Sequence, residues 1–111
     1  MRLITRRTLE QFASVHADAG QPLADLCAMF EAAQWRDADH LRSTSIFPAR
    51  PIGDRRVIFN VKGNEYRVIV SVRYADVSRG LNGIVRVHFV GKHADYDRID
   101  AATVDIPSSD R

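Results

Sequence analysis

The chain has 111 residues, of which 45% are hydrophobic and 27% are charged, with a formal net charge of +2. This length suits a single domain whose one core needs no disulfide, and the sequence has no run of about 18 apolar residues that would predict a membrane span. Cys27, the single cysteine, has no partner in the chain, and the N-terminus lacks the apolar stretch of a signal peptide. Together these features predict a cytoplasmic protein.

The basic residues are almost all arginine. Only Lys62 and Lys92 are lysines among the 16 basic side chains. A guanidinium group is planar, permanently charged and able to bind a phosphate through two hydrogen bonds, so this composition suits a nucleic acid or an acidic protein partner. A GC-rich genome would produce the same bias, and composition alone therefore does not identify the partner.

The first part of the chain predicts a short strand followed by a helical hairpin. Residues 2–4 form the expected strand, and apolar side chains at helical spacing predict a helix capped by Thr5 that runs to about Ala17. Gly20 is expected to end this helix. A second helix is expected over residues 22–35, with a proline in its first turn.

After the hairpin, the apolar period changes from helical to alternating. Residues 36–55 are expected to be irregular, with a turn around residues 39–42, because two prolines prevent a continuous helix. The remaining elements are expected to be three strands and a short helix, at residues 57–61, 66–74 and 84–90 and from His93 to about Ala102. This order predicts an α+β fold in which an N-terminal strand and helical hairpin pack on a small, mainly antiparallel sheet. We expect residues 1–104 to form one domain and residues 105–111 to form a flexible tail.

The densest set of reactive side chains follows the last predicted strand. Lys92, His93, Tyr96 and two aspartates lie within a few residues of one another. On a helix that begins at His93, the side chains of His93, Tyr96 and Asp97 share one face. Imidazole suits proton transfer near neutral pH, and the first amides of a helix attract phosphate. The alternative interpretation is that His93 only caps the helix while the aspartates favour its positive end.

The longest strand carries a second set of candidates. Arg67 and Arg73 share the face opposite its valines, and they must face solvent, a carboxylate or a phosphate because buried unpaired charges are costly. The alternative is an exposed sheet face with ordinary ion pairs. Asn60 and Asn64 flank the preceding turn, where asparagine most often serves the geometry of the turn. His88, on the next strand, is expected to be a structural histidine.

Metal and cofactor chemistry is not expected. His93, Asp95 and Asp97 are the only grouped candidate ligands, and three ligands within five residues cannot all point one way. The sequence contains neither a glycine-rich phosphate loop nor a Cys-x-x-Cys pair.

Three stretches of the chain carry a family resemblance. They are Asn-Val-Lys-Gly-Asn-Glu-Tyr-Arg-Val-Ile at residues 60–69, the strand at residues 85–90 and Gly-Lys-His-Ala-Asp-Tyr-Asp at residues 91–97. With the opening Met-Arg-Leu-Ile strand, they resemble the HigB toxins of type II toxin–antitoxin modules, small mRNA interferases related to the RelE-like toxins. The resemblance covers about residues 1–102 and is specific only as a combination. Lys92 departs from it, because a threonine is expected there in much of the family.

The resemblance implies a RelE-like fold and metal-independent cleavage of mRNA, commonly on translating ribosomes. It also implies neutralisation by a helix-turn-helix antitoxin. The expected site residues are His93, Arg67 and Tyr96 for catalysis and Lys92, Arg73, Asn64 and Asn60 for RNA binding. Cleavage by the RNA's own 2′-hydroxyl needs an acid and a base, and His93 is the candidate for one of these two roles. It also needs cations at the phosphate, for which Arg67 with Arg73 or Lys92 are the candidates.

Tyr96 is expected to stack on a base or to relay a proton, and Asn64 to orient Arg67 or to contact a base. Two other functions use the same exposed arginines and remain open at this point. One is an RNA- or ribosome-binding module without catalysis. The other is an interaction protein whose basic face holds an acidic partner.

Overall fold

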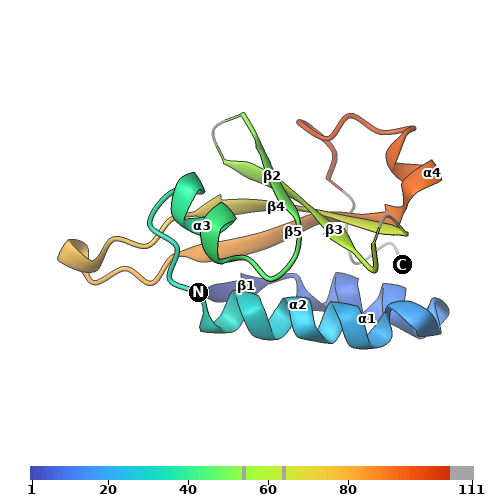
Figure 1. The fold of residues 1–111 in the computed structure, drawn as a ribbon, viewed down its shortest axis with the longest axis horizontal. Helices are drawn as coiled ribbons and strands as arrows, with labels where there is room; N and C mark the ends of the chain where they lie inside the picture. The colour runs from blue at the N-terminus through green and yellow to red at the C-terminus, as the bar shows by residue number, and fades with distance from the viewer. Residues whose placement is uncertain (54, 64, 106–111) are drawn as a thin grey trace.

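The chain folds into a five-stranded sheet that carries a pair of helices on one face and the C-terminal part of the chain on the other (Figure 1). The structure is a computed structural model, and it describes residues 1–53, 55–63 and 65–105. The strands are β1 (Arg2–Ile4), β2 (Ala49–Ile52), β3 (Arg56–Val61), β4 (Tyr66–Arg73) and β5 (Ile84–Lys92). The helical elements are α1 (Arg6–Val15), η1 (Ala17–Ala19), α2 (Gly20–Ala32), α3 (Ala38–Thr44), η2 (Val77–Arg79) and α4 (His93–Tyr96).

The sheet has the strand order β1-β5-β4-β3-β2. β1 runs parallel to β5, and the other neighbouring strands are antiparallel. The predicted α+β class and the mainly antiparallel sheet are therefore confirmed. None of the helices in the described part of the chain is long and apolar enough to cross a membrane.

The main core lies between the sheet and the layer formed by α1 and α2, which run side by side below the sheet in Figure 1. Its centre is aromatic: the ring centroids of Phe30 and Phe59 are 5.3 Å apart, and Trp35 stacks on Phe59. Cys27 is buried in this core as predicted, and burial raises the pKa of its thiol. Since the alternating valines of β3 and β4 point into this core, the side chains between them point to the opposite face of the sheet.

The start of α1 differs from the prediction. The side chain of Thr5 does not cap the helix. Its hydroxyl instead accepts a hydrogen bond of 2.9 Å from the backbone N–H of Val87 in β5. The parallel pairing of β1 with β5 brings this backbone within reach, so a tertiary contact replaces the local cap.

The helical hairpin also has a different joint. α1 ends at Val15, the turn η1 follows, and Gly20 begins α2 instead of ending α1. Asp18 in η1 accepts hydrogen bonds from the Lys62 ammonium at 2.7 Å and from the Tyr66 hydroxyl at 2.6 Å. These bonds attach the joint to the β3–β4 hairpin.

The region predicted to be irregular contains two regular elements. α3 begins after Asp37, whose carboxylate accepts a hydrogen bond of 2.7 Å from the backbone N–H of His40. β2 pairs with β3 and lies at the edge of the sheet. An edge strand tolerates Pro51, which cannot donate to a strand pairing. The prolines therefore excluded a longer helix but not a strand.

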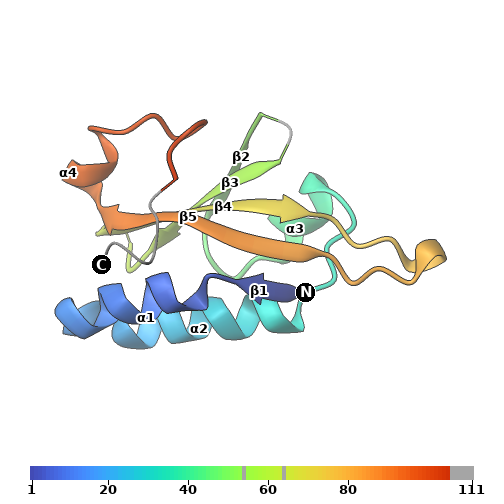
Figure 2. The same cartoon turned by 180° about the vertical axis from the view of Figure 1, so that it is seen from behind.

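The second face of the sheet carries a small apolar cluster formed by Ile58, Ile69 and Phe89. Residues 97–105, here called the C-terminal strap, lie over this cluster after α4 (Figures 1 and 2). The guanidinium of Arg56 holds the strap by donating to the carbonyl oxygens of Ala101 and Val104, at 3.1 and 2.6 Å.

The helix predicted from His93 to about Ala102 is therefore wrong beyond Tyr96. The carbonyls of Ala101 and Val104 bind a side chain of the sheet instead of continuing a helix.

A β-bulge shapes the same face. The register of β4 and β5 shifts between Ile69 and Val70, and His88 is the extra residue in β5. Its ring nitrogens lie 2.8 Å from the Ser71 hydroxyl and 3.0 Å from the Asp105 carboxylate. His88 is thus a buried, hydrogen-bonded histidine, as predicted. Asp105, expected to begin the flexible tail, is held at this point, and residues 106–111 lie outside the described residues.

Candidate functional site

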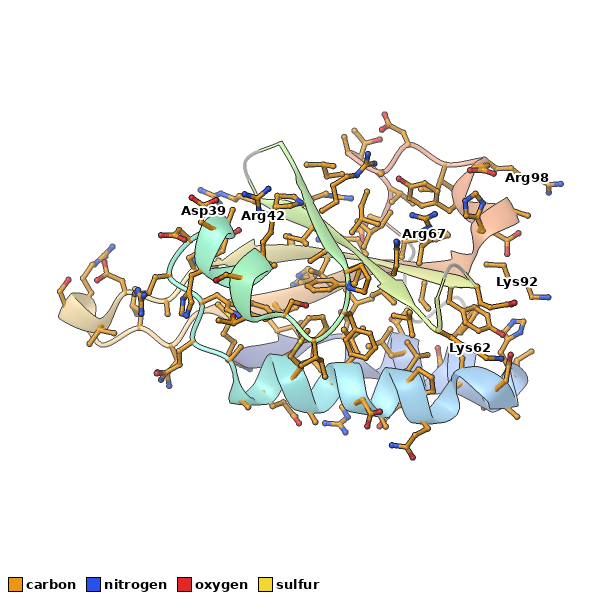
Figure 3. All side chains as sticks on the ribbon, viewed as in Figure 1. Asp39, Arg42, Lys62, Arg67, Lys92 and Arg98 are labelled. Atoms are coloured by element: carbon orange, nitrogen blue, oxygen red, sulfur yellow. The ribbon has the colours of Figure 1, made fainter. Side chains whose placement is uncertain are left out.

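A cleft of about 400 Å³ opens on the second face of the sheet, beside α4. Its lining residues are Pro48, Ala49, Arg50, Ile58, Asn60, Arg67 and Tyr96. These residues come from the chain before β2, from β2, β3 and β4, and from α4. Figure 3 shows the side chain of Arg67 extending toward α4 from the middle of this region.

Arg67 is held in the cleft by two contacts. Its Nη1 donates to the side-chain oxygen of Asn60 at 2.8 Å, and its guanidinium carbon lies 5.1 Å from the centre of the Tyr96 ring. Its Nε is buried and has no acceptor within the described part of the chain. An unpaired buried donor costs about 1–3 kcal/mol, and an anionic ligand that accepted from it would remove this cost.

Asn60 positions Arg67 rather than shaping a turn. It lies in β3 directly opposite Arg67 in the antiparallel pairing with β4. Its side chain is half-buried, and its carbonyl oxygen faces the guanidinium. Asn60 is therefore the observed candidate for the residue that orients Arg67, a role for which the sequence suggested Asn64. Asn64 itself lies outside the described residues.

Arg50 is a second cation of the cleft that the sequence interpretation missed. Its Nη2 donates to the Tyr96 hydroxyl at 3.5 Å, so Tyr96 has a guanidinium over its ring and another at its hydroxyl. Arg50 was missed because it lies in β2, a strand that the sequence interpretation did not predict. Pro48 and Pro51 flank Arg50, and the bias of pre-proline residues toward extended backbone was the available signal.

His93 lies next to the cleft but does not line it. Its ring centroid is 6.4 Å from that of Tyr96, and its Nδ1 is 3.3 Å from a carboxylate oxygen of Asp97. About half of the His93 side chain, 49%, is exposed. It lines a neighbouring hollow with Lys62, Glu65, Lys92 and Ala94. Arg67 and His93 therefore approach one ring, that of Tyr96, from adjacent hollows.

The predicted helix face is formed within a single turn, because α4 has only four residues. Gly91, where the preceding strand was expected to have ended, continues β5 instead. A Cβ atom at Gly91 would lie 2.7 Å from the Phe89 ring. This glycine therefore lets the ring of Phe89 lie close to the backbone that leads into α4.

The remaining predicted residues are separated from the cleft. Lys92 is exposed beside His93 and points away from Arg67 (Figure 3). Arg73 lines a different hollow at the other end of β4, together with Arg55 and Arg86. The structure thus brings Arg67, Asn60 and Tyr96 together and leaves Arg73 apart. In the described part of the chain, no three histidine, cysteine, aspartate or glutamate side chains gather as a metal site would require.

Comparison with known families identifies the chain. Residues 19–99 match the HigB toxin family, described as the RelE-like toxic component of a toxin–antitoxin system. The matched segment begins at the end of η1, runs through α4 and contains the whole cleft described above. No curated protein matches the chain significantly. Because the family match spans most of the sequence, the chain belongs to the HigB toxin family and is a toxin whose partner is an antitoxin.

Proposed function

We propose that this toxin is a metal-independent mRNA endoribonuclease. It acts in the cytoplasm on translating ribosomes and is neutralised by a helix-turn-helix antitoxin. The observation that carries the proposal is the half-buried guanidinium of Arg67, which has one buried N–H unpaired in the described part of the chain and lies beside an aromatic ring. Phosphate suits such a guanidinium, and an RNA base suits such a ring.

The reaction we propose uses the RNA's own 2′-hydroxyl. Removal of its proton lets the oxygen attack the adjacent phosphorus, the P–O5′ bond breaks, and the leaving 5′-oxygen takes a proton. The products are a 2′,3′-cyclic phosphate and a 5′-hydroxyl end. Positioned acid–base groups typically contribute about 10²–10⁴-fold to such a step. Charge already in place at the phosphate contributes about 10²–10³-fold more.

The position of each side chain in the structure supports the role that we propose for it. Arg67, fixed by Asn60 at 2.8 Å, stabilises the charge that develops on the phosphate. His93 supplies the acid or the base, and Asp97, 3.3 Å from its Nδ1, orients the ring. Tyr96 lies between them and stacks on a base or relays the proton. His93 is open to solvent and reaches a substrate that crosses Tyr96 from one hollow to the next.

Three variants of the intact chain test this proposal by RNA end mapping. Wild-type protein, Arg67→Gln and His93→Ala are incubated with mRNA in the presence of a chelator, with and without ribosomes. Arg98→Ala is the matched control, because Arg98 is an exposed residue just after α4. The proposal predicts cyclic phosphate ends with wild type and control and their loss with the other two variants.

Other results would overturn the proposal. RNA that is bound by all four proteins but never cut would identify a binding module without catalysis. Cleavage that survives His93→Ala would remove His93 from the mechanism, and cleavage that disappears with the chelator would contradict a metal-independent reaction. The antitoxin is tested separately by co-expressing the adjacent gene, which should suppress cleavage and co-purify with the toxin.

A further inference from the structure

The second face of the sheet holds another basic hollow, separate from the cleft. Its volume is about 220 Å³, and it lies between β1, β5, the end of β4 and the chain before β3. Its lining residues are Ile4, Arg55, Ser71, Val72, Arg73, Ile84 and Arg86. The C-terminal strap covers Ile58, Ile69 and Phe89, the apolar cluster between this hollow and the Arg67 cleft.

The sheet places two like charges, Arg73 and Arg86, close together at this hollow. In the pairing of β4 with β5, Arg73 is opposite Ile84 and Ser71 is opposite Arg86, so the two arginines are diagonal neighbours on one face. Like charges that are cross-strand neighbours repel each other. Neither guanidinium forms an ion pair with any carboxylate of residues 1–53, 55–63 or 65–105. An anion placed between them would turn this repulsion into attraction.

We propose that Arg55, Arg73 and Arg86 form a second phosphate site, which holds the RNA backbone outside the segment that is cleaved. This inference rests on the proposed action on RNA. Guanidinium forks match phosphate oxygens in pairs, and Ser71, whose hydroxyl is hydrogen-bonded to His88, lines the same hollow.

The position of the hollow favours RNA. Arg73 is six residues from Arg67 along β4, roughly 20 Å at the rise of a strand, and both side chains point to the same face. A few nucleotides of single-stranded RNA can span this distance. Three arginines and a serine line the hollow beside Ile4, Val72 and Ile84, and none of the lining residues is aromatic. This lining suits a polyanion better than a protein interface, whose core is typically depleted in charge and rich in aromatic residues.

The test measures how binding depends on salt. The probe is a 12-nucleotide 2′-O-methyl RNA, which cannot be cleaved by its own 2′-hydroxyl, and binding is followed by fluorescence anisotropy over a series of salt concentrations. The variant is Arg73→Gln with Arg86→Gln. The matched control is Arg7→Gln with Arg42→Gln, two exposed arginines of α1 and α3. All four side chains are exposed, so the fold should tolerate each change.

The proposal predicts a shallower salt dependence for the Arg73/Arg86 variant only. Each lost phosphate contact lowers the slope of log K against log salt by about 0.7, so the pair should lower it by about 1.4. An unchanged slope would overturn the second site. If the slope is unchanged but the wild-type protein cleaves unmodified RNA, the proposed nuclease function stands without the second phosphate site.

Two further outcomes separate the inference from the function. RNA that is never cleaved, together with the expected change of slope, would keep the phosphate site and reject the nuclease. A variant that loses affinity for the antitoxin while its RNA slope stays unchanged would show that the hollow binds acidic protein instead, and this would overturn the inference.

Discussion

Replacing Arg67 by methionine should abolish RNA cleavage while leaving the stability of the fold nearly unchanged. Methionine matches the unbranched arginine side chain as far as Nε and removes its charge and donors. The prediction rests on the contacts of this guanidinium, which has one amide partner, one aromatic neighbour and one buried N–H without an acceptor in the described residues.

The opposing contributions are of similar size. The variant loses a hydrogen bond from a charged donor to Asn60, worth about 1.5–3 kcal/mol, but no longer buries the unpaired Nε, which costs about 1–3 kcal/mol. It also loses the contact with the Tyr96 ring, worth about 0.5–1 kcal/mol. At the middle of these ranges the free energy of unfolding should fall by about 1 kcal/mol, or about 4 °C in melting temperature for a domain of this size.

Arg56→Met is the matched control. Arg56 lies on the adjacent strand, points to the same face and is also half-buried, but its guanidinium donates to two carbonyls of the C-terminal strap. Its replacement removes two such bonds and should lower the free energy of unfolding by about 3–6 kcal/mol. Urea unfolding followed by circular dichroism measures both variants, and end mapping of the same samples measures cleavage.

The reasoning fails if the two variants behave alike. A loss of stability in Arg67→Met as large as that in Arg56→Met would show that Arg67 serves the fold. Cleavage that falls less than tenfold in a folded Arg67→Met protein would exclude this guanidinium from the charge stabilisation, for which about 10²–10³-fold is expected.

Two other substitutions in the candidate site, and a third at the joint of the helical hairpin, give distinct results. His93→Ala should reduce cleavage by about 10²–10⁴-fold without changing the melting temperature, because the side chain is half-exposed; a melting shift would indicate a structural role. Asn60→Ala should raise the KM for RNA, because the Arg67 guanidinium then loses the partner that holds it in position. An unchanged KM would contradict the positioning role of Asn60.

Hydrogen bonds from Lys62, and then from Tyr66, lower the pKa of Asp18 from 3.8 to about 2. The stability contributed by this carboxylate is present above pH 3.8 and is lost as the pH falls toward 2. Between neutral pH and pH 2, the melting temperature of Tyr66→Phe should therefore fall by less than that of wild type. An equal fall in both proteins would refute the contribution of the Tyr66–Asp18 hydrogen bond.

The strands that carry the site followed from the sequence because their signal is local. Alternating valines predicted β3, β4 and β5 and placed Arg67 and Arg73 on the face opposite the core, as the structure has them. The pairing of strands is not local, however. Asn60 was expected to serve the geometry of the neighbouring turn or to bind RNA, whereas its contact with Arg67 exists only because β3 and β4 pair in one particular register.

The C-terminal region was predicted less well because tertiary contacts override its local preference. Residues 93–102 have a helical pattern, yet the helix ends after one turn. The strap then places Ile99, Ala101 and Val104 on the apolar cluster of the sheet, and Arg56 binds its carbonyls. Burial of this cluster and two charge-assisted hydrogen bonds outweigh a helix propensity that amounts to a few tenths of a kcal/mol per residue.

The arginines of the second face illustrate why composition could not identify the site. Arg56, Arg67 and Arg73 share this face, but their partners give each a different role. Arg56 is bound to backbone carbonyls and is committed to the fold. Arg67 is positioned by an amide that leaves a donor unpaired within the described residues, and Arg73 has a like-charged neighbour where an ion pair would be expected.

A protein selected for stability alone would pair or remove the last two charges, because buried donors and adjacent like charges both cost free energy. Their presence is therefore best explained by a ligand that carries negative charge. The same argument predicts that neutral substitutions at Arg67 and Arg73 cost little stability, whereas that at Arg56 costs much.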